Sequence, residues 1–477
     1  MAKVFRIEKE SLENASYLFS GCTDLEVFST ADNCAGWGTN GQYYPALKYA
    51  THMFDDAYYL KVAYCSMPNL ITAPYMFGEA GHLREYDLSE MENCFIALEL
   101  GGRLSNAMNM FDGAKNFKHI DVRNIGNKDS ADSANYNRMF QNVKHVGEIT
   151  LYIASDSFES IDMTYAFNGS YVKAMKFASS EELGRISVSN FQKIKNCPGM
   201  FLNCSAEGGI LLNYSSRRVA NNQCNLGSMF HQARTPKISI NGSLQEVYKQ
   251  GEGLIGGLCY VMNTASNVNI GGMFDGCTFP ESIDWVEEPK SWESGGVCFT
   301  DATGLFANNK SLRSFTAKNT LNGIDGSWSV AYMAFGGSYI EELSLTNSFN
   351  YCTTDQMFSG CRNLKNVHIE NALNSPIEPC NEFFSSDRLC GYDSRDGKIE
   401  RISLYNAFAS CADLSKLCWN NYGAGWDKKL SSCSNPGTLT VTGTGCGAEN
   451  VNLSQAFGVN HILTDSTGGA NMSKLVF

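Results

Sequence analysis

The chain has 477 residues, and its 37 Lys and Arg against 49 Asp and Glu give a formal net charge of −12 at pH 7. At 43% hydrophobic and 18% charged residues, it is too apolar for a disordered chain and too weakly charged for a binder of polyanions or membrane surfaces. We therefore expect a folded chain, globular or built from repeats, that binds no nucleic acid.

The chain carries no segment with the composition of a membrane anchor. No stretch approaches the ~18 uninterrupted apolar residues that a spanning helix requires. In the opening segment 1–8, Lys3 and Arg6 interrupt the place where a secretory signal needs apolar residues. The sequence therefore predicts no membrane insertion and no cleaved secretion signal.

A short phrase built on phenylalanine recurs along the chain. Its clearest copies read Phe-x-Gly-Cys or a close variant and start at Phe19, Phe111, Phe274, Phe358 and Phe408. Further copies start at Phe54, Phe77, Phe140, Phe167, Phe201, Phe230, Phe306, Phe335, Phe384 and Phe457. These anchors lie about 31 residues apart on average, with a minimum near 23, which indicates one structural unit that carries insertions.

Apolar residues return six, nine and eleven positions after many anchors, as Phe117, Ile120 and Val122 do after Phe111. The last two positions have the two-residue spacing of a strand, so each unit is predicted to contribute a short strand. The same pattern predicts strands at Leu83, Tyr86 and Leu88 after Phe77 and, one residue shorter, at Val172, Met175 and Phe177 after Phe167.

The residues around each anchor predict turns and close packing. The segment before the anchor is expected to be partly helical or a turn, and the Gly or Asn that often follows it suits a turn. Cys and Ala interchange three positions after the anchor, so a small side chain is needed there. The cysteines at this position are therefore expected to be reduced packing residues: Cys22, Cys204, Cys277, Cys361 and Cys411.

This pattern resembles the BspA-type leucine-rich repeat, whose unit of about 23 residues combines an aromatic anchor, a small Gly-Cys pair and a short strand. The resemblance covers residues 15–477 and implies an α/β repeat fold. That fold is a leucine-rich-repeat solenoid with a parallel β-sheet on one face, turns or short helices on the other, and loop insertions. It implies a single continuous domain of about 15 units behind an N-terminal cap, residues 1–14, and a role in binding or adhesion without catalysis.

The motifs that could carry chemistry lack the context they need. Residues 251–256 match a Gly-rich dinucleotide fingerprint, but polar residues precede them where a buried strand is required. The seven histidines show no metal-binding spacing, and the cysteines form no Cys-x-x-Cys pair. We therefore expect no enzyme activity, no cofactor and no metal site.

Two surfaces remain as candidate binding sites. The outward strand positions are mostly small and polar: Ser29, Tyr64, Asp87, Asp121, Thr150, Lys176, Ser239, Asp284, Thr316, Ser344, His368 and Ser403. The insertions instead carry aromatic side chains, which bring a large contact area. We expect these residues, in loops, to form the ligand-binding site: Trp292, Trp328, Trp419, Tyr422 and Trp426.

These observations favour a non-enzymatic recognition or attachment protein. A chain that begins at Met1 without a secretory signal fits a bacteriophage virion structural or appendage protein, of tail or capsid, made in the host cytoplasm. Its expected partners are other virion or surface proteins and a host-surface glycan or protein. The alternatives are a BspA-like adhesin, on the bacterial cell surface or secreted, and an intracellular protein-binding scaffold.

Overall fold

The computed structural model describes residues 11–28, 42–81, 91–175, 183–216, 225–242, 268–279, 281–286, 298–323 and 329–352. Beyond these it describes residues 357–358, 361, 363, 366–370 and 372 and the strands β21 to β27. The chain divides into two compact units: Met1–Asn222 with Ala233–Gln245, and Gln223–Gln232 with Glu246–Phe477. Parallel β-sheets dominate both, and helix is almost absent from the described residues, where the 3-10 helix η1 (Phe191–Lys193) stands out.

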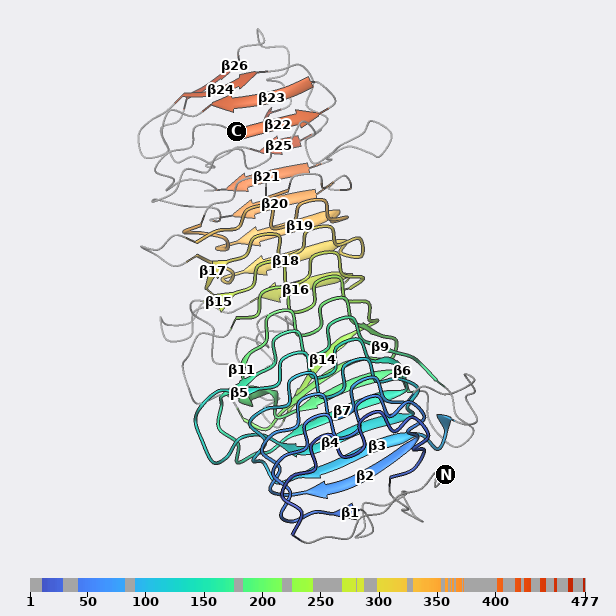
Figure 1. The fold of residues 1–477 in the computed structure, drawn as a ribbon. Coiled ribbons are helices and arrows are strands. Elements are labelled where there is room, and N and C mark those ends of the chain that lie inside the picture. The colour runs from blue at the N-terminus through green and yellow to red at the C-terminus, as the bar shows by residue number, and fades with distance from the viewer. Residues whose placement is uncertain are drawn as a thin grey trace. The chain divides into compact units, whose positions relative to one another are not determined.

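The first unit is built on an eight-stranded sheet in which every pair of neighbours is parallel (Figure 1). Its strands, in spatial order, are β1 (Gln42–Tyr43), β2 (Val62–Met67), β3 (Phe95–Leu100), β4 (His119–Ile125), β7 (Glu148–Ile153), β10 (Arg185–Ser189), β13 (Gly209–Tyr214) and β14 (Ile238–Gly242). In β2 and β7 burial alternates along the strand, so one face of the sheet packs on the core and the other meets solvent.

Two three-stranded parallel sheets complete the first unit. One has the order β11 (Ile194–Asn196), β8 (Ile161–Asp162) and β5 (Ala134–Asn135). The other has the order β12 (Ser205–Ala206), β9 (Tyr171–Val172) and β6 (Lys144–Val146). The strands β5, β8 and β11 each precede one of the anchors Phe140, Phe167 and Phe201, and β6, β9 and β12 each follow one. Each of these three repeats therefore contributes a strand to all three sheets.

In the described residues, the segment that carries each anchor from Phe19 to Phe335 is a run of turns. The sequence is compatible with either a turn or a partly helical segment. The residues two before and two after the anchor are left-handed at all eleven anchors from Phe19 to Phe335, for example Asn109 (φ 56°) and Gly113 (φ 73°) around Phe111. The amides of Ala107, Asn109, Phe111 and Gly113 donate to carbonyls of the next repeat. This ladder of four backbone bonds holds residues other than glycine in a conformation that they rarely adopt.

The anchors of the first unit form one continuous stack of rings. Neighbouring rings from Phe19 to Phe201 have centroids 4.9 to 5.4 Å apart and planes within 14° of parallel. A buried methionine precedes many of them, including Met53, Met110 and Met200. Stacked aromatic rings beside soft thioether side chains fill the core between the sheets.

The second unit repeats this plan. Its seven-stranded parallel sheet has the order β16 (Ser282–Val286), β18 (Ser314–Lys318), β19 (Glu342–Thr346), β20 (Asn366–Glu370), β21 (Arg401–Tyr405), β25 (Asn450–Asn452) and β27 (Leu475–Val476). The strands β15 (Val268–Asn269) and β17 (Phe299–Asp301) form a separate parallel pair. The rings from Phe230 to Phe358 stack with centroids 5.1 to 5.6 Å apart.

Two predicted strand positions are wrong. After Phe77 the strand that joins the main sheet is β3, so Ala97 takes the register position expected for Asp87, which lies outside the described residues. After Phe167 the strand is β10, so Ser187 takes the register position expected for Lys176, which also lies outside the described residues. In both repeats an insertion separates the anchor from its strand, and a fixed spacing rule cannot detect it.

No motif cysteine in the described part of the chain is joined in a disulfide, and Cys204, Cys277 and Cys361 are buried. Burial raises the pKa of the Cys204 thiol and raises that of Cys361 to about 12. The Sγ atoms of Cys277 and Cys361 lie 2.6 and 2.9 Å from the carbonyl oxygens of Phe230 and Phe335. Each therefore ties one repeat to the one before it, while Cys411 lies outside the described residues.

These environments predict a sharp difference in thiol reactivity. In native protein at pH 8, iodoacetamide should label the exposed Cys22 at least about 100-fold faster than Cys204 or Cys361, because alkylation needs an accessible thiolate. Peptide mass spectrometry measures each site, and the same protein in denaturant supplies the control in which all three react at similar rates. Equal native rates would contradict the burial of these thiols.

Candidate interaction surface

The aromatic residues expected to bind ligand are only partly placed. Trp419 lies in β22 (Leu417–Asn421) and Trp426 in β23 (Ala424–Lys429), and the two are direct partners across an antiparallel hairpin. Both residues therefore lie in strands, and the prediction that they lie in loops is wrong. The hairpin belongs to a four-stranded sheet with β24 (Thr438–Thr442) and β26 (Ile462–Asp465). Trp292, Trp328 and Tyr422 lie outside the described residues.

The outward strand positions form continuous columns, as parallel strands in register require. In the first unit the central column is Tyr64, Ala97, Asp121, Thr150, Ser187, Leu211 and Ser239. In the second unit it is Asp284, Thr316, Ser344, His368 and Ser403. Ser29 lies outside the described residues. Such columns bring together side chains that are far apart in the sequence.

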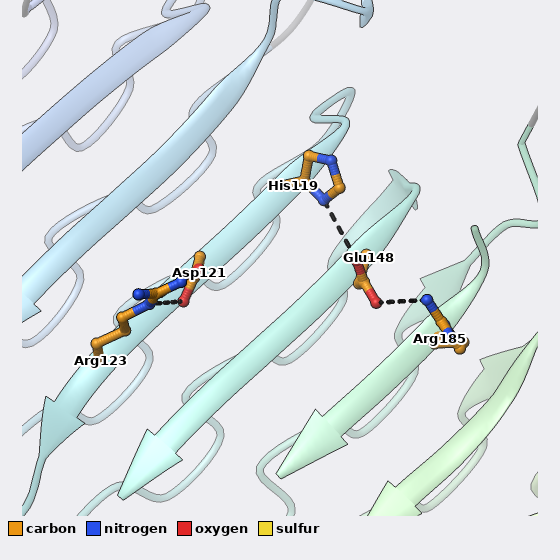
Figure 2. A network of polar contacts seen from close by, with 5 residues as sticks. All are labelled: His119, Asp121, Arg123, Glu148 and Arg185. Carbon is orange, nitrogen blue, oxygen red and sulfur yellow. Dashed lines mark hydrogen bonds and ion pairs between the residues drawn. The ribbon is translucent and has the colours of Figure 1, made fainter. Parts of the chain in front are cut away.

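Charged side chains gather on this face of the first unit (Figure 2). The carboxylate of Glu148, on β7, lies between a basic side chain from each neighbouring strand. Its Oε2 is 3.5 Å from Nδ1 of His119 on β4, and its Oε1 is 3.4 Å from Nη2 of Arg185 on β10. The neighbouring strands β4, β7 and β10 thus supply one row in which an acidic side chain lies between two basic side chains.

A second cluster lies beside this row on β3 and β4. Arg123 donates from Nη2 to Oδ2 of Asp121 at 3.1 Å, two residues away on the same strand (Figure 2). Asn124 donates through Nδ2 to the carboxylate of Glu99 on β3. The two clusters together make a polar surface that offers both donors and acceptors.

The two carboxyl groups at the centre of this surface are shifted in opposite directions. The hydrogen bond from His119 lowers the pKa of Glu148, and the charges of Arg185 and His119 lower it further against the effect of burial. Burial raises the pKa of Asp121, and its bond to Arg123 only partly offsets this. Glu148 is thus held as an anion, whereas Asp121 is protonated more readily than an ordinary aspartate.

The Glu148 shift predicts a pH-dependent contribution to stability. A carboxyl group whose folded pKa is lowered stabilises the fold above its unfolded pKa, about 4.3, and loses that contribution as the pH falls through the folded pKa. Glu148→Gln should therefore cost about 1 kcal/mol at pH 7 and almost nothing well below pH 4. Urea denaturation at both pH values measures this difference.

A matched control for this test is Glu341→Gln. Its carboxylate pairs with Arg313 at 3.6 Å and is more exposed than Glu148, at 33% against 20%. Its replacement should cost less at pH 7 because solvent screens a more exposed pair. A Glu148→Gln cost that stays constant down to pH 3 would contradict the assigned shift.

Sequence reasoning missed His119, Glu148 and Arg185. His119 and Glu148 each stand eight residues after an anchor, so a tabulation of that position would have found a basic and an acidic side chain in consecutive repeats. Arg185 gives no such signal, because an insertion moves it to eighteen residues after Phe167.

The described residues include no group of three or more His, Cys, Asp or Glu side chains suited to a metal ion. No helix within them combines the length and the apolar character needed to cross a membrane. The Gly-rich segment 251–256 lies outside the described residues. No protein-family model, curated protein or solved structure matches the chain.

Proposed function

We propose that this protein is a non-enzymatic recognition protein that presents the outward face of its first-unit sheet to a partner. One observation carries the proposal: β4, β7 and β10 align His119, Glu148 and Arg185 in a row on a solvent-facing surface. A continuous repeat surface of this kind suits extended ligands, because every strand adds the same set of outward positions.

We infer that each unit is a leucine-rich-repeat solenoid of the BspA type. The parallel main sheets, the stacked anchors and the short segment between anchor and strand support this inference. The face opposite the strands consists of hydrogen-bonded turns in the described residues, so in this chain turns take the place that helices hold in other repeat families.

The proposed ligand is a glycan on the host surface. Sugar hydroxyls both donate and accept hydrogen bonds, which suits a surface where the Glu148 carboxylate lies beside the nitrogen atoms of His119 and Arg185. Tyr152, on the same strand and 48% exposed, adds an aromatic ring on which a sugar can stack. The ion pairs hold the side chains in place before the ligand arrives, which lowers the entropic cost of binding.

Binding to a printed glycan array and to intact host cells tests this function. Wild-type protein is expected to bind, and the double variant Asp121→Asn with Glu148→Gln should lose at least 10-fold in affinity at unchanged circular dichroism. The control Glu341→Gln changes a carboxylate of the second unit and should bind like wild type. Absence of wild-type binding to every glycan and cell would overturn the proposal.

The aromatic hairpin is the competing site within the same experiment. Trp419→Ala combined with Trp426→Ala removes both rings from the paired hairpin positions. If this variant loses binding while the sheet-face variant keeps it, the site lies on the hairpin, as the sequence predicts. Antibody labelling of virions and of cell envelopes would distinguish the proposed virion carrier from an adhesin.

A further inference from the structure

The charged row on the first-unit sheet continues past Arg185. Glu148, on β7, lies between His119 on β4 and Arg185 on β10 (Figure 2). On the next strand, β13, Gly209 is the direct partner of Arg185. Lys237, the residue before β14, lies against the other side of Gly209. Across these neighbouring strands the row therefore reads basic, acidic, basic, glycine, basic.

The start of β13 leaves a gap between the two basic side chains. Gly209 has φ at 109°, a conformation that disfavours any side chain. The Cγ and Cε atoms of Lys237 lie 3.3 and 3.8 Å from the place a Cβ atom would take at Gly209. Cγ of Arg185 lies 3.1 Å from the corresponding place at Gly208. The stems of Arg185 and Lys237 thus flank two residues that carry no side chain.

This gap carries an excess of positive charge. Within the described residues, Arg185 pairs with Glu148 alone, at 3.4 Å, and its side chain is 44% exposed. Lys237 forms no ion pair with a described residue. Glu207, just before the two glycines, accepts hydrogen bonds from the hydroxyl of Tyr171 and from a backbone amide. Two basic side chains therefore face the gap, and one carboxylate of the protein balances them.

We propose that an acidic sugar of the ligand binds in this gap, with its carboxylate or sulfate group between Arg185 and Lys237. A guanidinium binds such oxyanions through paired N–H donors, and a lysine ammonium adds a point charge. Arg185 contacts Glu148 through Nη2, so other N–H groups of its guanidinium remain for the ligand. This inference rests on the proposed function and deepens it, because it names the class of glycan that the sheet face selects.

Protection of Arg185 from phenylglyoxal, measured by peptide mass spectrometry, tests the gap itself. Galacturonate at about 50 mM should slow modification of Arg185 at least about 3-fold, whereas galactose at equal ionic strength should not. Lys237→Gln should abolish this protection at unchanged circular dichroism. Lys318→Gln is the matched control, because Lys318 is an exposed lysine on β18 of the second-unit sheet, and its replacement should leave the protection unchanged.

Two results of this experiment would overturn the inference. One is equal protection by galactose and galacturonate, which would show that the acid group is not recognised. The other is protection in Lys237→Gln that equals protection in wild type, which would show that Lys237 does not face the bound group.

A glycan array separates this inference from the proposed function. Wild-type protein should bind glycans that contain carboxylated or sulfated sugars and should bind their neutral counterparts at least 10-fold more weakly. The acid group whose removal weakens binding identifies the ligand as carboxylated or sulfated. Binding confined to neutral glycans would overturn this inference and leave the proposed function standing. Protection of Arg185 by galacturonate without binding to any glycan or cell would support the anion site and overturn the proposed function.

Discussion

Phe111→Ala is expected to lower the free energy of unfolding by about 3–5 kcal/mol, the range for removal of a buried phenylalanine. The Phe111 ring is fully buried and stacks on Phe77 at 5.3 Å and on Phe140 at 4.9 Å. Alanine would leave a cavity between two rings that the backbone ladder holds apart. Denaturant unfolding measures the loss, and hydrogen exchange locates it.

The loss should be concentrated around the altered repeat, because stability in a repeat array is a sum of contributions from units and their neighbours. Amides between residues 77 and 140 should exchange faster, while those of the second unit change little. Phe158→Ala is the control, since this ring is 46% exposed and its removal should cost less than about 1 kcal/mol. A uniform rise in exchange over both units would contradict the local effect.

Gly81→Ala is expected to cost about 3 kcal/mol, for two separate reasons. The backbone at Gly81 is left-handed, with φ at 87°, a conformation that disfavours any side chain. A methyl group there would also collide with the carbonyl oxygen of Lys115 and the ring of Phe117. The carbonyl belongs to the backbone of the next repeat, so it cannot rotate away.

Gly21→Ala separates these two costs. Gly21 has a similar left-handed conformation, with φ at 69°, but no atom lies within 4 Å of the place its methyl group would take. Its replacement should cost only about 1 kcal/mol, the conformational part. Thermal denaturation of both variants measures these costs. An equal decrease in melting temperature for the two variants would show that the close approach of Gly81 to Lys115 is not a tight contact.

The repeat is readable from the sequence because each unit must fill the same core position. An anchor such as Phe111 stacks on its copies before and after it, so the same residue type recurs wherever the unit recurs. Strand residues such as Ile120 and Val122 follow the two-residue alternation because their sheet has one buried face. Where an insertion follows Phe77 or Phe167, the spacing rule fails, because packing in the core does not fix the length of a loop.

The turn ladder could not be predicted from residue types. Tyr17, His52, Tyr75 and Arg138 occupy left-handed positions where glycine or asparagine would be expected. Hydrogen bonds to the next repeat impose this conformation, so it depends on the neighbouring coil and not on the local sequence. The charged row shows the same dependence, because the pairing of β10 with β7 brings Arg185 beside Glu148 although eighteen residues separate Arg185 from its anchor.

The sequence by itself determined that this chain is a repeat, where its aromatic anchors lie and which small residues pack beside them, because these follow from local patterns of size and polarity. Only the tertiary structure decided which strands pair and which charges meet, because these depend on the register between segments that lie 23 to 49 residues apart in the main sheets.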